Sequence, residues 1–186
     1  MTVILLGPPG SGTGTQGDIL ARRLGVPKIT TGDLLNEAIR RDTHLGREAK
    51  RFMDRGDLVP DKLILQLIEE ELARPEAAQG IVMDSFPRTL RQAEEVNRLL
   101  VERGERVEHV LLFDVPEEEL VKRLQARAAE QDRTETREVI QKRLDAYRKS
   151  TAPLVGHYRE LGVLHIISGT GTEDEIAERV KGVLGR

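Results

Sequence analysis

The sequence predicts an α/β fold, a three-layer sandwich in which helices cover both faces of a five-stranded parallel sheet. Two observations support this prediction. Five short runs are continuously apolar, which is typical of strands buried on both faces of a parallel sheet. Longer segments with helical periodicity separate these runs, and strands that alternate with helices form crossover units on one sheet. A length of 186 residues is enough for one domain of this kind.

The elements follow one another in a regular order. The first apolar run leads into a glycine-rich turn and a helical stretch that continues to Leu24. Apolar residues recur at three- and four-residue spacings between Leu63 and Leu72, and the pattern returns around Leu120 and Leu124 and over Val139–Leu144. These spacings predict amphipathic helices. The expected strands are Val3–Leu6, Lys28–Thr31, Gly80–Asp84, His109–Val115 and Val163–Ser168.

One polar segment interrupts this order. From Ala128 to Arg137 the chain reads AAEQDRTETR, with no apolar anchor beyond its alanines. Such a segment is either a solvated loop or frayed helix end, or a mobile lid over a ligand. The residues alone leave both interpretations open.

Composition excludes several classes of protein. The 29 basic and 32 acidic residues are interleaved and give a net charge of −3, whereas a nucleic-acid binder usually has a basic excess. Without cysteine there can be no disulfide and no thiolate zinc site, and the four histidines lack the spacing of a metal site. The apolar run Val3–Leu6 is too short for a signal peptide or a membrane span. We therefore expect a cytoplasmic protein with neither a nucleic-acid nor a membrane partner.

The turn after the first strand has the composition of a phosphate-binding loop. It reads Gly-Pro-Pro-Gly-Ser-Gly-Thr-Gly-Thr-Gln from Gly7 to Gln16, between a predicted strand and a predicted helix. Glycines at these positions let successive backbone N–H groups point inward at the positive end of the helix dipole, where phosphate binds well. The strict pattern G-x-x-x-x-G-K-[ST] fails, because Thr13 holds the lysine position. A glycine-rich turn without a ligand is the alternative that this segment leaves open by itself.

This loop resembles that of the adenylate kinase family, G-x-P-G-x-G-K-G-T-Q, at every defined position but the lysine. Further similar segments follow in the family's order over nearly the whole chain. They are Thr30–Leu35, Leu45–Gly46, Gly56–Asp61, Asp84–Thr89 with Gln92, Phe113–Pro116, Arg123, Arg127, Arg143–Tyr147 and Thr151–Leu154.

The resemblance implies a single P-loop-type kinase domain over residues 1–186, with strand order 2-3-1-4-5. Its reaction would be reversible phosphoryl transfer from MgATP to AMP, giving two ADP. Residues 30–59 would form a small mobile helical segment that binds AMP, and residues 126–136 a short lid. The implied partners are ATP, AMP and ADP, and the implied cofactor is Mg²⁺ without zinc. Nothing in the sequence suggests an oligomer, so we expect a monomer.

The resemblance also assigns an ATP site. Backbone N–H groups from Gly10 to Thr15 would cradle the β-phosphate, and the Thr15 hydroxyl would lie near magnesium. Asp84 resembles the acidic residue that orders magnesium-bound water, so no side chain is expected to bind the metal directly. Guanidinium groups match phosphate oxygens, and the catalytic set implied is Arg88, Arg123, Arg143 and Asp84. The ATP-binding set is Gly10, Ser11, Gly12, Thr13, Gly14, Thr15, Arg123, Arg127 and Gly171.

On the AMP side, Thr31, Val59 and Gln92 match the family's adenine contacts. The Gln92 amide can pair with a donor and an acceptor of adenine together. Without the resemblance, Arg123, Arg127 and Arg143 would be read as helix-surface residues. The AMP-binding set that the resemblance implies is Thr31, Asn36, Asp57, Leu58, Val59, Ser85, Phe86, Pro87, Arg88, Gln92, Arg133 and Arg143.

Four departures from the family pattern remove charge or space from these sites. Thr13 replaces the phosphate-loop lysine, and Asn36 stands where the family has an arginine against the AMP phosphate. Ser85 replaces a glycine beside the AMP base. The lid motif R-x-D-D is not intact, and Arg133 with Glu135 is its nearest equivalent. The fold and the ligands are therefore predicted more firmly than fast turnover.

Two alternatives remain. The first is a kinase for another monophosphate, such as UMP, CMP or a deoxynucleotide. Thr31 and Gln92 favour adenine as the base, whereas Ser85, in place of the family's glycine beside that base, argues against it. The second is a nucleotide-binding protein with impaired catalysis, which Thr13 favours.

Overall fold

The computed structural model describes residues 1–55, 57, 59–131 and 135–185. Within them, one parallel sheet is formed by strands β1 (Thr2–Leu6), β2 (Lys28–Thr30), β3 (Ile81–Asp84), β4 (Val107–Asp114) and β5 (Leu164–Ser168). The strand order is β2-β3-β1-β4-β5 and every pairing is parallel, which confirms the predicted sheet. The second strand ends one residue earlier than expected, because the Thr30 hydroxyl accepts from the Asp33 N–H and starts a helix at Thr31.

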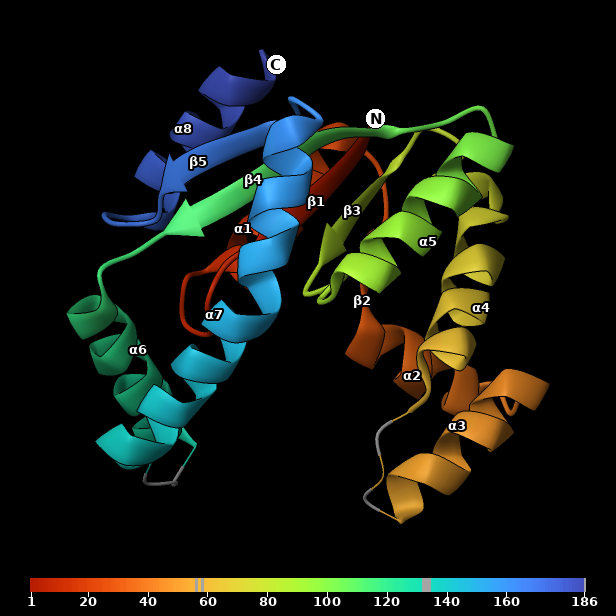
Figure 1. The fold of residues 1–186 in the computed structure, drawn as a ribbon, viewed down its shortest axis with the longest axis horizontal. Coiled ribbons are helices and arrows are strands. Elements are labelled where there is room, and N and C mark those ends of the chain that lie inside the picture. The colour runs from red at the N-terminus through yellow and green to blue at the C-terminus, as the bar shows by residue number, and fades with distance from the viewer. Residues whose placement is uncertain (56, 58, 132–134, 186) are drawn as a thin grey trace.

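Helices cover both faces of the sheet, as predicted (Figure 1). On one face, α1 (Thr13–Leu24) and α8 (Glu173–Leu184) pack against the buried side chains of β1, β4 and β5. On the other, α4 (Asp61–Leu72), α5 (Leu90–Glu102) and α7 (Arg137–Glu160) share a second core with the same strands and β3. A short 3-10 turn, Pro75–Ala77, links α4 to β3. No helix among the described residues is both long and apolar enough to cross a membrane.

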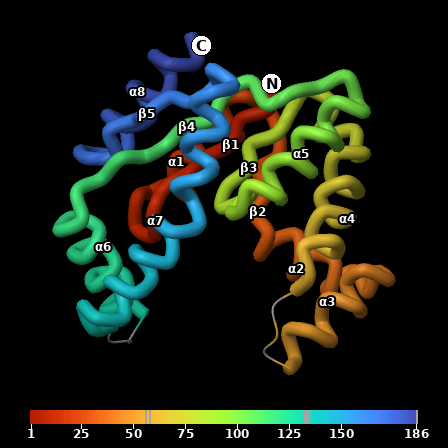
Figure 2. Tube along the Cα trace, viewed as in Figure 1, coloured from red at the N-terminus to blue at the C-terminus, as the bar shows by residue number. Residues whose placement is uncertain are grey.

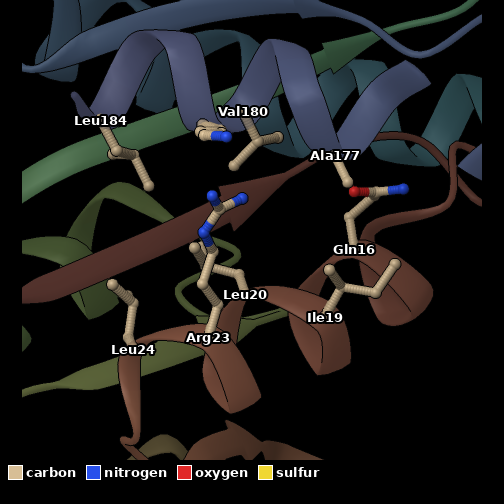
Figure 3. Close-up of a pocket in the computed structure, with 9 residues that line it drawn as sticks. Gln16, Ile19, Leu20, Arg23, Leu24, Ala177, Val180 and Leu184 are labelled. Carbon is tan, nitrogen blue, oxygen red and sulfur yellow. The ribbon is translucent and has the colours of Figure 1, made fainter. Parts of the chain in front are cut away.

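The packing of α1 against α8 fixes the helix that follows the glycine-rich loop. Figure 3 shows Leu20 and Leu24 of α1 facing Val180 and Leu184 of α8 across a small apolar pocket. At the other end of this contact, the Gln16 side chain donates to the Glu173 carbonyl at 2.9 Å. The first turns of the two helices are therefore held together, and the loop before α1 has a rigid support.

Two further groups of helices extend beyond the carboxyl ends of the strands, one on each side (Figures 1 and 2). On one side α2 (Thr31–Arg40), α3 (His44–Asp54) and the start of α4 form a small core of their own. On the other, α6 (Glu117–Glu130) packs against the start of α7. The polar segment that began at Ala128 is thus partly the end of α6, and its residues 132–134 lie outside the described part.

The contact between α2 and α3 depends on a glycine. A Cβ atom added at Gly46 would overlap the Ala38 carbonyl and the Ile39 nitrogen, so the two helix backbones touch there. Thr43 caps α3 by accepting from the Gly46 N–H at 3.0 Å.

We therefore expect Gly46→Ala to destabilise the protein. Overpacking against backbone costs about 1–3 kcal/mol, and each kcal/mol lowers the melting temperature by about 2–4 °C at this size. The control is Gly182→Ala in α8, where an added Cβ meets nothing within 4 Å. That change should raise stability slightly, because alanine favours helix. Thermal denaturation followed by circular dichroism measures both, and an unchanged melting temperature for Gly46→Ala would contradict the close approach.

Candidate active site

The loop from Gly7 to Gly12 turns the chain from β1 into α1, and within it the Ser11 N–H donates to the Pro8 carbonyl at 2.9 Å. Gly10 and Gly12 have φ angles of 86° and 93°, in the left-handed region that glycine adopts most easily. Gly12 is the N-cap of α1 and provides no side-chain acceptor. The orphan N–H groups at the start of α1, with the positive end of its dipole, therefore form a cradle for an anion.

The loop is closely packed around its glycines. A Cβ atom at Gly10 would lie 3.1 Å from Cγ of Leu124 in α6, and one at Gly7 would overlap the Ser11 hydroxyl. Ser11 is 1% exposed, and its hydroxyl has no hydrogen-bond partner among the described residues. Larger residues at these positions would push the backbone away from a ligand.

Asp84 faces the start of α1 from the end of β3. Its position is set by the register of the sheet, in which Leu5 of β1 pairs with Asp84. The side chain is buried, and a Cβ atom at Gly14 would lie 3.7 Å from its Oδ2. Mg²⁺ prefers oxygen ligands, and Asp84 provides a carboxylate near Gly14, the residue before the exposed Thr15. These residues fit the magnesium that the sequence implied.

Arg123 joins the glycine-rich loop to the loop after β5. Its guanidinium donates to the Gly169 carbonyl at 3.0 Å and to the Gly10 carbonyl at 3.5 Å, and Nε donates to Glu119 at 3.0 Å. The side chain is thus fixed over the phosphate cradle, where the resemblance assigns it to ATP. Gly171 lies in the same β5–α8 loop with a φ of 104°.

Thr13 begins α1, where the family has a lysine. Its methyl group faces Gly7: a Cβ atom there would lie 2.9 Å from Thr13 Cγ2. A different lysine approaches the same helix, because the Lys28 ammonium lies 3.4 Å from the Gly14 carbonyl and 2.6 Å from Asp18. Lys28 was not among the predicted site residues.

A second cluster follows Asp84 along the chain. The Ser85 hydroxyl donates to Asp84 Oδ1 at 3.3 Å, and Arg88 Nε donates to the Ser85 carbonyl at 2.8 Å. Phe86 and Pro87 are buried beneath them. The Gln92 amide accepts from the Arg88 N–H and donates to Asp61, each at 2.7 Å. Asp84, Ser85, Arg88 and Gln92 are therefore brought together as one continuous hydrogen-bonded group.

The remaining AMP-side residues lie on the α2–α3 extension. Thr31 is the first residue of α2, and Val59 packs into the core shared by α2, α3 and α4. Asp57 pairs with Arg55 at 3.0 Å. Asn36 is exposed. Leu58 and Arg133 lie outside the described residues.

Cations near Asn36 do not replace the missing arginine. Arg40 and Arg41 both pair with Glu37 on α2. Hydrogen bonding from Arg40 holds the pKa of the Glu37 carboxyl below its usual value. Both guanidinium groups are therefore engaged by one carboxylate, which cancels one of their two charges.

Two predicted phosphate ligands lie on the α6–α7 side. Arg127 is exposed near the end of α6. Arg143 on α7 pairs with Glu135 at 2.8 Å, so its guanidinium is held by the segment assigned to the lid. Among the described residues, no contact places either arginine against the glycine-rich loop.

Three residues in contact with the site were missed from the sequence. Glu119 stands four residues before Arg123, which is the spacing of a helical ion pair and a usable signal. Asp61 ends the resembling segment Gly56–Asp61 and Lys28 begins an expected strand, but their contacts with Gln92 and Gly14 arise only through the tertiary fold.

A phosphate cradle at the first helix of a parallel sheet, facing an acidic strand end, defines the class of P-loop nucleotide-binding proteins. Comparison with known protein families and proteins identifies the family within this class. The family model described as adenylate kinase matches residues 5–163. Adenylate kinase of Thermus thermophilus is 50% identical over 184 residues, covering 98% of this chain and 96% of that protein. That of Mycolicibacterium paratuberculosis is 45% identical over the full length of both chains. This chain belongs to the adenylate kinase family, whose bacterial short-lid type it fits, and is a nucleoside monophosphate phosphotransferase.

Ser85 tests how the site tolerates a side chain at a position that favours glycine. Its φ is 63°, which strains a residue with a Cβ atom. We expect Ser85→Gly to be more stable than Ser85→Ala by about 1 kcal/mol, because both lose the hydroxyl and only glycine relieves the backbone.

The matched controls are Ser150→Gly and Ser150→Ala on α7. Because glycine disfavours a helix, Ser150→Gly should there be less stable than Ser150→Ala by about 1 kcal/mol. Urea denaturation measures all four variants. If Ser85→Ala were as stable as Ser85→Gly, the left-handed backbone at this position would be wrong.

Proposed function

We propose that this protein catalyses reversible phosphoryl transfer from MgATP to AMP, giving two ADP. The observation that supports it most is the approach of Asp84 to the first turn of α1, with Arg123 fixed over the same loop. The membership of the adenylate kinase family supports the choice of nucleotides.

The residues of the loop would bind phosphate mainly through the backbone. N–H groups between Gly10 and Thr15 would donate to oxygens of the β-phosphate, and Arg123 would neutralise charge beside it. Phosphoryl transfer needs little covalent chemistry from the protein, so positioning and charge neutralisation account for most of the catalysis. Thr15 and Asp84 would lie near the Mg²⁺ bound with ATP, and that ion would supply further neutralisation of the transferring group.

The acceptor would lie on the other side of Asp84. Thr31, Val59 and Gln92 are proposed to contact the adenine, and Arg88 the AMP phosphate. The segments 30–59 and 126–136 are proposed to close over the two nucleotides. Closure on the lid side would require Arg143 to exchange Glu135 for a phosphate, since the two form an ion pair here.

The missing charges suggest slow turnover. Thr13 keeps a hydroxyl but cannot follow the transferring group with a positive charge, and Asn36 lacks the charge of the family's arginine. Losing one preorganised electrostatic contact costs roughly 10²–10³ in rate, by analogy with oxyanion-hole donors. Backbone contacts do not depend on these side chains, so nucleotide affinity should suffer less than rate.

Thr13 also supports a second candidate, a nucleotide-binding protein with impaired catalysis. A kinase for another monophosphate stays open on account of Ser85, and competition between AMP, UMP and CMP separates it from the first proposal. The monomeric state and the cytoplasmic location of the protein remain predictions from the sequence.

A coupled assay of ADP formation from ATP and AMP tests the proposal. Thr13→Lys should raise kcat at least about tenfold, or ~1.4 kcal/mol of barrier, and change nucleotide dissociation constants less. Lys28→Met is the companion variant, because Lys28 already approaches Gly14.

If the unaltered protein turns over at roughly 1–100 per second, as kinases commonly do, another residue has replaced the lysine and our account of Thr13 fails. A large loss of rate in Lys28→Met would then identify that residue. Absence of ADP formation in both the unaltered protein and Thr13→Lys would contradict the proposed activity itself.

A further inference from the structure

The amide of Gln92 is held in one orientation by partners from two different elements. Its Oε1 accepts from the Arg88 backbone N–H, and its Nε2 donates to Asp61 Oδ1, each at 2.7 Å. A backbone N–H can only donate and a carboxylate can only accept, so both contacts require the same orientation. Turning the amide over would bring two donors together at Arg88 and two acceptors together at Asp61.

This arrangement is partly shielded from water. Gln92 on α5 is 6% exposed. Asp61 is the first residue of α4 and is half-buried, so the hydrogen bond joins α4 to α5. Polar contacts in such surroundings are stronger than in water, and a mismatched partner there is correspondingly costly. The orientation of Gln92 is therefore a fixed property of the folded chain.

Two of the amide's hydrogen-bonding positions are thus occupied, and one N–H and one acceptor lone pair remain. When the Gln92 amide is held in one orientation, its remaining N–H and lone pair can pair with only one arrangement of donor and acceptor on a base. Adenine and cytosine present an amino group next to a ring nitrogen acceptor. Hypoxanthine, guanine and uracil present a carbonyl next to a ring N–H, which is the reverse pattern. An amide free to turn over would match either kind.

We propose that Asp61 is a positioning residue that makes the monophosphate site select bases with an amino group beside a ring nitrogen. It acts through Gln92 and touches no nucleotide itself. This inference rests on the proposed function, in which Gln92 contacts the acceptor base. Asp61 is not among the AMP-binding residues that the family resemblance implies. The inference also states which bases the monophosphate site accepts.

The test compares AMP with IMP, which differ in this edge alone. Asp61→Asn is nearly isosteric and can present either an oxygen or an amino group to Gln92, so only the Arg88 N–H still opposes turning the amide over. A mismatched buried polar partner weakens binding by on the order of 10–100-fold. We therefore expect the ratio of kcat/KM for AMP over IMP to fall at least about tenfold in Asp61→Asn, with the KM for ATP unchanged.

Two further variants separate positioning from a structural role. Asp61→Leu removes the acceptor altogether, and it should lower the AMP-to-IMP ratio and raise the KM for AMP. Asp174→Asn is the matched control, because Asp174 lies in the first turn of α8 as Asp61 does in α4. It should leave the ratio at the value of the unaltered protein. Melting temperatures are measured for all three variants.

The outcomes distinguish this inference from the proposed function. If the unaltered protein forms ADP from AMP, an unchanged ratio in Asp61→Asn and Asp61→Leu overturns the positioning role and leaves the function standing. The same holds if Asp61→Leu only lowers the melting temperature. If no ADP forms, calorimetric titration with AMP and with IMP gives the same ratio from binding. A protein that binds neither monophosphate overturns both proposals.

Discussion

The parallel pairing of β1 with β3 is the constraint on which the rest of the site depends. It aligns Leu5 with Asp84, so that one strand delivers the glycine-rich loop and its neighbour delivers a carboxylate at the same edge of the sheet. Ligands of open α/β sheets bind at this carboxyl edge. A shift of the pairing by one residue would turn Asp84 toward the opposite face and away from Gly14. The position of the Asp84 carboxylate relative to the glycine-rich loop thus depends on the register between β1 and β3.

The charges of the site are distributed unevenly around this register. Arg123 is fixed by two backbone carbonyls and Glu119, whereas Arg143 is held by Glu135 on the lid side. The first is preorganised for a phosphate, and the second must exchange partners before it can meet one. Backbone N–H groups are the part of the phosphate cradle that none of the departures from the family pattern removes. In the proposed function, nucleotide binding by the loop therefore persists where side-chain charge is absent.

Most of the fold follows from local pattern. Continuous apolar runs identified all five strands to within a few residues, and helical spacing identified the helices from Leu63 to Leu72 and around Leu120. The ends of elements were less predictable, because they depend on caps such as the Thr30 hydroxyl. The loop, Asp84 and Gln92 were predicted as site residues because motifs keep their spacing along the chain. Asp61 and Lys28 were not, since their contacts span 31 and 14 residues and exist only after the sheet and its helices have assembled.

The central claim is that the backbone of the loop, with Asp84 opposite it, holds the nucleotide phosphates without the usual lysine. A crystal structure with Mg²⁺ and a dinucleotide of two adenosines joined by five phosphates tests this most directly. The account predicts phosphate oxygens within hydrogen-bond distance of the backbone nitrogens from Gly10 to Thr15, and the metal between Thr15 and Asp84. Polyphosphate bound instead at the opposite edge of the sheet, near Met1 and Gly104, would contradict it.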